Sequence, residues 1–330
     1  MARTPMEWER RIGRRLRLRD LHILATVVER GSMAKAAAHL AVSQPAVSDA
    51  IANLEAALGV RLLDRLSHGV EPTIYAAALL KRGHVVFDEL RQGIRDIEFL
   101  ADPTAGEVRV GCPESLAPVA SAIIDRLSRD YPAVNVHVVT TQPATLEFRE
   151  LRDRKVDLLL GRMISPSLVD EDIDVEVLFE DRLFVVAGSR NPWTRRSKVE
   201  LAQLASERWI LLPPNNALSS LVAQAFRSLG LDPPRESVTA DIHFRIQLLT
   251  TGRFLTVLPA DLLQFVGERW SLKILPIDLG IQAPSLGVLT LRNRTLSPVA
   301  QLFIDCTREV AKSMASRIKA HTPPRKPTVA

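Results

Sequence analysis

Cysteine is scarce in this chain, since the 330 residues include only Cys112 and Cys306, which lie far apart in the sequence. Two distant cysteines form neither a disulfide scaffold nor a CxxC motif for a metal or a redox reaction. We expect reduced thiols, because a redox switch would require the two sulfur atoms to meet in space. The seven histidines are scattered without the spacing of zinc ligands, so no metal site is expected.

Signatures of catalysis are also missing. No GxSxG, phosphate-binding loop or GxGxxG segment precedes a predicted helix, and no group of histidines and carboxylates recurs with catalytic spacing. We therefore expect neither an enzyme nor a cofactor. The alternative is an enzyme or a solute-binding protein that uses the C-terminal region as its site.

No apolar run approaches the roughly 18 to 20 residues that a membrane helix needs. The first twenty residues contain seven arginines with no apolar stretch behind them, which is unlike a secretory signal. We expect a cytoplasmic protein with no membrane partner. The chain does have the composition of a globular protein, with 46% hydrophobic and 25% charged residues, and its length favours two or three folding units.

Positive charge is concentrated at the two ends of the chain. Residues 1–73 contain 11 Lys and Arg against 8 Asp and Glu, and residues 308–330 contain 6 against 1. The central region, 74–307, contains 26 against 29. A basic N-terminal unit suits a polyanion such as DNA, because neutralisation of phosphates releases counterions. We interpret residues 317–330 as a flexible basic tail.

Two short helices are predicted close together near the N-terminus. Residues 18–30 have helical apolar spacing, and Gly31 follows where a left-handed C-terminal cap would lie. Ser32 can cap a second helix that ends near Ala41.

The next helix has two different faces. Ser43 can cap it, and Pro45 falls in its first turn, where a missing N–H costs nothing. Its apolar stripe consists of Val47, Ile51, Leu54 and Leu58. The opposite face is short and polar, with Ser43, Gln44, Ser48, Asp49, Ala52 and Asn53. Such a face can approach base edges in the major groove, so we predict a helix-turn-helix over Ala34 to Asn53. A helical bundle with incidental polar residues is the alternative.

A wing is predicted after this helix. Residues 59–73 suggest two short strands around a turn at His68 and Gly69. Arg65 and His68 could then reach backbone phosphates or a minor groove.

These residues resemble the LysR-type transcriptional regulators. The matching residues are Gly31, Ser32, Ala36, Ala37, Leu40, the run Ser43 to Ser48, Ile51, Leu54, Glu55, Leu58, Gly59, Leu62, Arg65 and Thr73. The resemblance implies sequence-specific binding to double-stranded promoter DNA. It favours contacts from Ser32, Ser43, Gln44, Pro45, Ser48, Asn53 and Arg65. Within the family, the segments 131–134, 155–162 and 213–215 look most like the galactose-binding-protein-regulator branch.

The chain also departs from the family pattern. Members often carry Arg, Gln or Lys where this chain has Asp49, Ala50 and Ala52, and commonly Gly where it has Ala76. Fewer basic side chains imply fewer phosphate contacts from the recognition helix. The basic leader, residues 1–17, is expected to compensate. Arginines in and just beyond the leader include Arg10, Arg11, Arg14, Arg15, Arg17 and Arg19.

A heptad seam follows the wing. It consists of Ala76, Leu80, Gly83, Phe87, Leu90, Ile94 and Ile97. Alternating steps of four and three residues are typical of a coiled coil, so we predict a linker helix over 75–101 that dimerises through 76–97. A dimer would read both halves of a two-fold DNA site. A helix that packs on its own domain is the alternative. The helix-breaking segment 102–106 indicates a domain boundary.

From Glu107 onward, strands alternate with helices and predict parallel βαβ units in two lobes. The fold class is therefore a winged helix-turn-helix domain (18–74), a long linker helix, and a two-lobe α/β domain over 106–316. The lobes are expected to comprise 106–180 plus 284–316, and 181–276.

The α/β region resembles the family's effector domain, which is similar to periplasmic solute-binding proteins. The resemblance implies that a small-molecule effector binds between the lobes and alters promoter activity. A sugar, a sugar acid and an aromatic or other organic carboxylate are all compatible with the polar residues described next. It also implies a tetramer built from dimers, with RNA polymerase as a possible further partner.

Ligands of open parallel sheets bind beyond the carboxyl ends of the strands. This rule selects the candidate effector residues Ser115, Thr141, Gln142, Arg162, Asn216 and His243. Arg162 can clamp a carboxylate with two hydrogen bonds. A structural salt bridge from Arg162 to an acidic residue within 170–176 is the alternative. For Ser115, Thr141 and His243 the alternative is helix capping.

Overall fold

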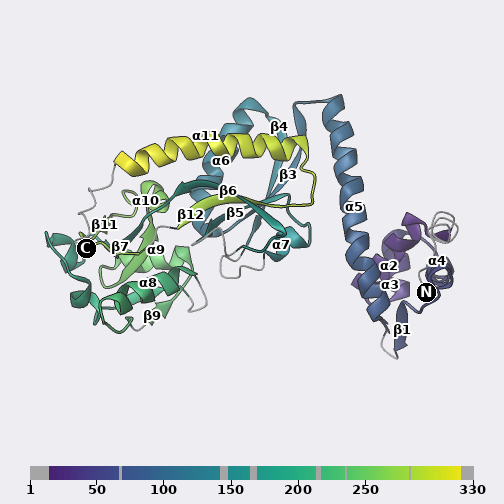
Figure 1. The fold of residues 1–330 in the computed structure, drawn as a ribbon, viewed down its shortest axis with the longest axis horizontal. Helices are drawn as coiled ribbons and strands as arrows, with labels where there is room; N and C mark the ends of the chain where they lie inside the picture. Colours follow the sequence, from purple (N-terminus) through teal and green to yellow (C-terminus); the bar gives the residue numbers. More distant parts are fainter. Residues whose placement is uncertain are drawn as a thin grey trace. The chain divides into compact units, whose positions relative to one another are not determined.

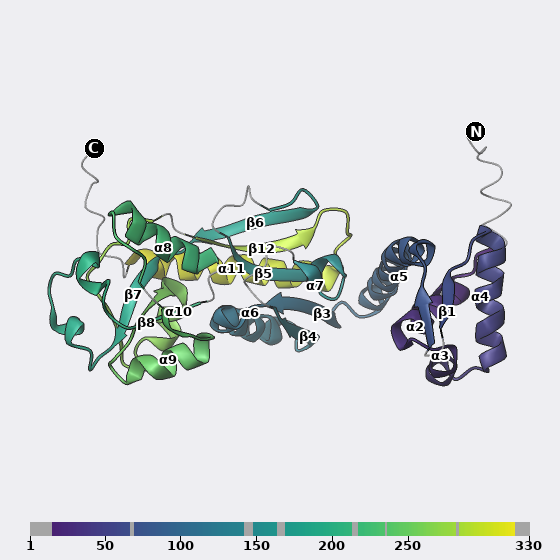
Figure 2. The same cartoon turned by 90° about the horizontal axis from the view of Figure 1, so that it is seen from below.

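The computed structural model describes residues 15–66, 69–141, 148–163, 169–212, 217–234, 236–281 and 284–320 (Figures 1 and 2). The chain divides into two compact units, Met1–Arg91 and Gln92–Ala330. Several residues singled out from the sequence lie outside the described residues. They are Arg10, Arg11, Arg14, His68, Gln142 and Asn216, together with the end of the tail from residue 321. No described helix combines the length and the apolar character needed to cross a bilayer.

The first unit contains three helices and a two-stranded wing. These elements are α2 (Leu18–Arg30), α3 (Met33–Leu40), α4 (Gln44–Leu58), β1 (Leu63–Leu66) and β2 (Gly69–Pro72). The three helices contact one another, and the two strands pair antiparallel. Fully buried side chains in the core of this unit include Leu24, Val27, Val47, Leu54 and Leu62. The hydrophobic periodicity predicted from the sequence therefore becomes one shared apolar core.

The helix caps of this unit agree with those predicted from the sequence, with one exception. Gly31 ends α2 in the left-handed conformation, with φ 66°. The Oγ of Ser43 accepts a hydrogen bond from the amide of Ala46 at 3.4 Å, and Pro45 lies in the first turn of α4. Ser32 does occupy the N-cap position of α3, but the predicted capping by its side-chain oxygen is wrong. Ser32 contributes its backbone carbonyl to the first helical hydrogen bond, but its side chain makes no capping bond.

Two five-stranded sheets form the centre of the second unit. The sheet of lobe 1 has the order β4 (Ala133–Thr140), β3 (Ala105–Cys112), β5 (Leu158–Met163), β12 (Ser285–Leu291) and β6 (Ile173–Glu180). The sheet of lobe 2 has the order β11 (Leu272–Ile274), β7 (Leu183–Gly188), β10 (Leu255–Pro259), β8 (Trp209–Leu211) and β9 (Glu236–Thr239). The chain passes from lobe 1 to lobe 2 between β6 and β7, and it returns between β11 and β12.

Both sheets are mixed, whereas the sequence predicted parallel units throughout. β3 pairs parallel with β4 and β5, but β12 pairs antiparallel with β5 and β6. In lobe 2, β7 pairs antiparallel with β10 and β11. The sequence did not predict β6 or β11 as strands. The antiparallel strands adjoin the two crossings between lobes, where the chain turns back without the helical crossover that a parallel pair requires.

Helices surround these sheets. They are η1 (Glu114–Leu116), α6 (Ala117–Asp130), α7 (Arg149–Arg152), η3 (Pro192–Arg195), η4 (Leu201–Leu204), α8 (Ala217–Ser228), α9 (Ile242–Thr250), α10 (Ala260–Val266) and α11 (Pro298–Ala320). α6 and α11 contact each other and the sheet of lobe 1 (Figure 1). An apolar cluster continues from this layer into lobe 2. α11 extends to Ala320, beyond residue 316, where the sequence placed the end of the domain.

Helix α5 (Ile74–Ala101) belongs to both units. Part of its predicted heptad seam is buried and part is exposed. Ala76 and Leu80 are buried in the core of the first unit, as the alternative interpretation of the seam held. Leu90, Ile94 and Ile97 are instead exposed, with 47%, 57% and 68% of their surface accessible. The N-terminal half of the seam therefore packs on its own domain, and the C-terminal half leaves apolar surface uncovered within the chain.

The C-terminal end of α5 is joined to lobe 1 by one buried carboxylate. Asp157 accepts hydrogen bonds from Arg95 at 3.1 Å, Arg294 at 2.8 Å and the amide of Arg109 at 2.8 Å. Asp157 and Arg294 are both 2% exposed at their side chains. Because a buried charge needs a partner, this cluster fixes the last turns of the helix to the sheet. It explains why the division between units falls within α5, before the helix-breaking segment 102–106.

Candidate DNA-binding and effector-binding sites

The outer face of α4 is the candidate DNA-reading surface. Val47, Ile51 and Leu54 are at most 3% exposed and point into the core of the first unit. The exposed residues of the helix and its N-cap include Ser43, Gln44, Pro45, Asp49, Ala52 and Asn53, and Ser48 is half-buried. The structure therefore separates the two faces as the sequence predicted, and the exposed face has short side chains.

Glu55 links the recognition helix to the wing. Its Oε1 accepts hydrogen bonds from the amides of Leu62 at 2.7 Å and Leu63 at 3.3 Å. Thr73 fixes the other end of the wing, because its hydroxyl donates to the carbonyl of Arg61 at 2.9 Å and accepts from the amide of Ala76 at 3.3 Å. These contacts give Glu55 and Thr73 structural roles in orienting the wing.

The wing also touches the end of α2. The amide of Val70 donates to the carbonyl of Gly31 at 3.1 Å. A Cβ at Gly69, which has φ 148°, would lie 2.5 Å from the same carbonyl oxygen, so only glycine permits this approach. Ser32 follows directly and is half-buried. Of Arg65, only the backbone in β1 is described.

In the second unit, Ser115 and His243 lie on elements that face each other across the two lobes. Ser115 is half-buried in η1 and does not cap a helix, because Pro113 and Leu116 occupy the cap positions. His243 does not cap α9 either, since the carboxylate of Asp241 accepts from its amide at 3.1 Å. The exposed His243 ring lies 3.9 Å from the carboxylate of Glu114, which connects α9 of lobe 2 to η1 of lobe 1.

Thr141 comes directly after β4 and is 5% exposed. Its amide donates to the carbonyl of Cys112 at 3.2 Å, which places Thr141 beside the carboxyl end of β3. Among the described residues its hydroxyl makes no hydrogen bond. Thr141 and Ser115 therefore both lie at the carboxyl end of the parallel part of the lobe 1 sheet.

Arg162 lies within β5, one position before its end, and it joins the two lobes. Its Nη2 lies 3.3 Å from the carboxylate of Asp181 and forms a closer ion pair with Asp261. Asp181 is at the crossing from lobe 1 to lobe 2, and Asp261 is in the first turn of α10. The sequence-based partner range, 170–176, is wrong: acidic residues 170 and 172 pair with Arg152 instead.

Burial controls the protonation of this triad. The Asp181 and Asp261 side chains are 0% exposed, and the Arg162 side chain is 9% exposed. Burial, reinforced by the neighbouring Asp261, raises the pKa of Asp181 to about 7. Burial also raises the pKa of the nearby Cys112 thiol to about 12, so this sulfur stays protonated. Cys112 and Cys306 are both buried and free.

Three buried polar residues of the second unit, Asp181, Asp261 and Arg245, were not singled out as candidate site residues from the sequence. Asp181 and Asp261 are distant in sequence, and no spacing rule connects them with Arg162. Arg245, 5% exposed on α9, donates to Thr256 at 3.0 Å and pairs with no carboxylate among the described residues. Burial lowers the pKa of Arg245 to about 10. The periodicity of apolar residues does not identify such residues. A buried arginine occupies a core position, and the sequence pattern expects a hydrophobic side chain there.

Comparison with known proteins covers both units. The model of the LysR substrate binding domain matches residues 101–312, and that of the bacterial regulatory helix-turn-helix protein, lysR family, matches residues 18–77. The chain belongs to the LysR family. It is a LysR-type transcriptional regulator with a DNA-binding helix-turn-helix and an effector-binding domain.

Relatives of this LysR-type regulator extend over most of its length. The transcriptional regulator GbpR of Azospirillum brasilense is 28% identical over 96% of this chain and 92% of its own. GalR of Pseudomonas putida is 28% identical over 90% of this chain and 75% of its own. Both relatives support the predicted similarity of this chain to the galactose-binding-protein-regulator branch. Full-length CbnR, solved with its target DNA, is 20% identical with a TM-score of 0.51 and covers 90% of this chain and all of that one. It shares the fold.

Proposed function

We propose that this LysR-type regulator binds a partly palindromic promoter site as a dimer or tetramer and that a small organic effector between the lobes changes how it acts there. Residues 18–74 would bind DNA, 75–101 would link and dimerise, and 106–316 would bind the effector. A protein with this partner would act in the cytoplasm. RNA polymerase is a further candidate partner at the promoter.

The observation that carries the effector part of the proposal is the ion-pair triad between the lobes. Arg162 belongs to lobe 1, whereas Asp261 belongs to lobe 2, so a change in lobe arrangement must change their separation. An effector can shift a conformational equilibrium only if it binds one arrangement better than the other. We propose that Arg162 contributes to this preference through its ion pairs, in place of the simple carboxylate clamp expected from the sequence.

The chemical class of the effector follows from the groups at the lobe edges. Ser115 and Thr141 offer hydroxyl groups, and His243 offers a ring nitrogen. Gln142 and Asn216 retain their proposed roles as amide donors and acceptors. These groups suit a hydroxylated sugar, a sugar acid or an aromatic or other organic carboxylate.

The DNA part of the proposal depends on the exposed face of α4. Gln44, Ser48 and Asn53 can donate and accept hydrogen bonds at base edges, and Asp49 adds no positive charge. Phosphate contacts must then come mainly from the wing and the arginines of the leader.

A mobility-shift assay on DNA upstream of the protein's own coding region tests the regulator. We expect a specific complex that weakens steeply between about 50 and 200 mM salt. Thermal-shift screening of sugars and organic acids would identify effectors, because a ligand that binds the folded state raises its stability. With such an effector, Arg162→Ala should retain the DNA complex and lose the effector response, whereas Arg152→Ala should retain both. Absence of a specific complex would contradict the DNA part, and a normal response of Arg162→Ala would contradict the effector part.

A further inference from the structure

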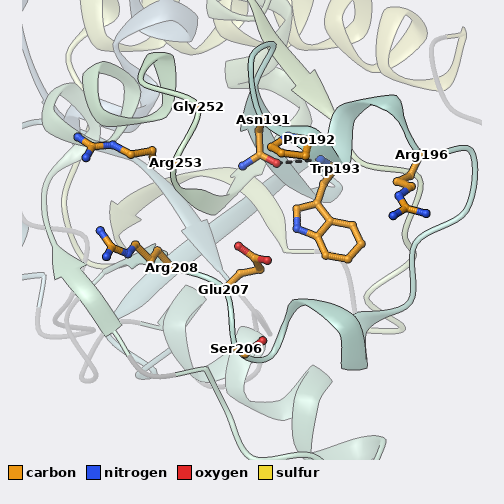
Figure 3. Close-up of a pocket in the computed structure, with 9 residues that line it drawn as sticks. All are labelled: Asn191, Pro192, Trp193, Arg196, Ser206, Glu207, Arg208, Gly252 and Arg253. Carbon is orange, nitrogen blue, oxygen red and sulfur yellow. Dashed lines mark hydrogen bonds between the residues drawn. The ribbon is translucent and has the colours of Figure 1, made fainter.

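Lobe 2 contains a pocket of about 660 Å³ whose lining includes none of the candidate effector residues between the lobes. Figure 3 shows the side chains that line it. The lining residues are Asn191, Pro192, Trp193, Arg196, Ser206, Glu207, Arg208, Gly252 and Arg253. They come from η3 and its surroundings, from the segment just before β8, and from the turn just before β10. The volume falls within the roughly 300–1,000 Å³ of typical small-molecule sites.

This pocket and Asp261 lie at opposite ends of the strands of the lobe 2 sheet. β8 and β10 are parallel, and both begin beside the pocket, whereas Asp261 follows the carboxyl end of β10. β10 has 5 residues, and a strand rises about 3.3 Å per residue, so roughly 15 Å of strand separates the two positions. The pocket therefore cannot belong to the effector region proposed between the lobes.

The walls of the pocket are held in place by local contacts. The Oδ1 of Asn191, a residue 3% exposed, accepts a hydrogen bond from the amide of Trp193 at 3.0 Å. Gly252 has φ 76°, and a Cβ there would lie 2.8 Å from the Cβ of Arg190. The two loops can approach this closely only because residue 252 is glycine. The indole of Trp193 packs partly on the apolar cluster of lobe 2, which fixes its position.

Charge in the pocket is predominantly positive. The lining includes three arginines, Arg196, Arg208 and Arg253, and a single carboxylate, that of Glu207. In Figure 3 the guanidinium groups of Arg208 and Arg253 extend away from that carboxylate. Across the described part of the chain, none of the three guanidinium groups forms a hydrogen bond or an ion pair. In Figure 3 the Trp193 indole and the Glu207 carboxylate lie between Arg208 and Arg253 on one side and Arg196 on the other. Guanidinium groups bind carboxylates and phosphates through paired hydrogen bonds, and an indole face stacks with a flat ring.

We propose that this pocket binds a small organic anion that carries a planar ring. The ring stacks on Trp193, and the exposed side chains of Arg208 and Arg253 turn toward it to bind the anionic group. Glu207 accepts a hydrogen bond from a hydroxyl or amino group of the same molecule. All residues of this site belong to lobe 2. The proposal can therefore be tested independently of the proposed effector region between the lobes.

Fluorine NMR of the full-length protein labelled with 5-fluorotryptophan tests the proposal. The chain contains four tryptophans, and Trp193→Phe would assign the Trp193 signal. The probes are 4-hydroxybenzoate, its neutral amide 4-hydroxybenzamide, and acetate, an anion without a ring. We expect 4-hydroxybenzoate to shift the Trp193 signal saturably, and the other two probes to require at least 10-fold higher concentrations. No saturable shift with 4-hydroxybenzoate, or an equal response to acetate or to the amide, would overturn the proposal.

Charge variants provide the second measurement. Arg208→Gln combined with Arg253→Gln should raise the Kd for 4-hydroxybenzoate at least 10-fold. Arg227→Gln, on the exposed face of α8 in the same lobe, is the matched control for loss of positive charge and should leave the Kd unchanged. An equal loss of affinity in the control would show that only general charge attraction is involved and would overturn the site.

Discussion

The Nη2 of Arg162 lies 3.3 Å from the Oδ2 of Asp181, in a place where neither side chain is more than 9% exposed. Arg162 lies one position before the end of β5 in lobe 1, and Asp181 is where the chain leaves that lobe. Asp261 from lobe 2 completes the triad. A buried cation shared between two carboxylates makes the junction of the lobes sensitive both to substitution and to protonation.

Arg162→Ala should destabilise the second unit by about 3–5 kcal/mol, because it leaves two buried carboxylates without their cation. Urea unfolding followed by tryptophan fluorescence would measure this, since three of the tryptophans, Trp193, Trp209 and Trp270, are in lobe 2. The control is Arg152→Ala, which removes ion pairs that are 29% or more exposed and should cost about 0–1 kcal/mol. Similar losses in both variants would contradict the importance of burial.

The stability of the second unit should include a pH-dependent contribution from Asp181. Its pKa in the folded protein is about 7, whereas an exposed aspartate has a pKa of about 3.9. The folded state therefore holds this proton more tightly than the unfolded chain between these values. The contribution to the free energy of unfolding is fully present below about pH 4 and is lost as pH rises through about 7.

Asp181→Asn removes that contribution while keeping the shape of the side chain. Urea unfolding at pH 5, 6, 7 and 8 should show that wild type loses stability relative to Asp181→Asn as the pH rises to about 7, with little further change above it. Asp153→Asn, at an exposed site, should follow the wild-type profile. A constant difference between wild type and Asp181→Asn across this range would contradict the raised pKa.

The parts of this protein that the sequence predicted are those encoded by neighbouring residues. The cap at Ser43 and the left-handed Gly31 depend on residues within a few positions of a helix end, and both are confirmed. The fold class is confirmed as well, because the helix-turn-helix pattern and the alternation of strands and helices are regular signals. Ser32 shows the limit of such signals, since a suitable residue at a cap position left its hydroxyl unused.

The partners of Arg162 could not be predicted in the same way. Asp261 is 99 positions away, and it meets Arg162 because α10 follows β10 of the other lobe. The heptad seam shows the same limit for one helix. Periodicity identified an apolar face of α5, but it could not show that Leu80 packs within the first unit whereas Ile94 stays exposed. Whether each apolar side chain of α5 is buried depends on which other part of the folded protein packs against that turn of the helix.

Gln44→Ala and Ser48→Ala should weaken recognition of the specific DNA site without unfolding the first unit. Each residue lies on the accessible face of α4, and loss of a base contact costs about 1–3 kcal/mol of discrimination. Competition binding with specific and random DNA would measure the ratio of the two affinities. Ser43→Ala is a poorer test, because removing the cap also costs about 1 kcal/mol of helix stability. An unchanged affinity ratio in both variants would exclude this face from base readout.

Ile94→Glu combined with Ile97→Glu should dissociate the oligomer. These two side chains are 57% and 68% exposed within the chain, and together with Leu90 they present a contiguous apolar strip on α5. Water contact with such a strip is unfavourable, and a second copy of the helix would cover it. Two buried glutamates facing their counterparts would remove that gain and add repulsion. Sedimentation velocity would show a lower mass at micromolar protein concentration.

The matched control for this pair is Lys81→Glu, which places a glutamate on an exposed position of α5 away from the strip. By helical geometry, at about 100° per residue, position 81 points about 140° away from position 94 and about 160° away from position 97. We expect Lys81→Glu to keep the wild-type mass and Leu80→Ala to lower the stability of the first unit without dissociating the oligomer, because Leu80 is buried in its own core. If Ile94→Glu with Ile97→Glu kept the wild-type mass, the subunits would have to associate through another surface.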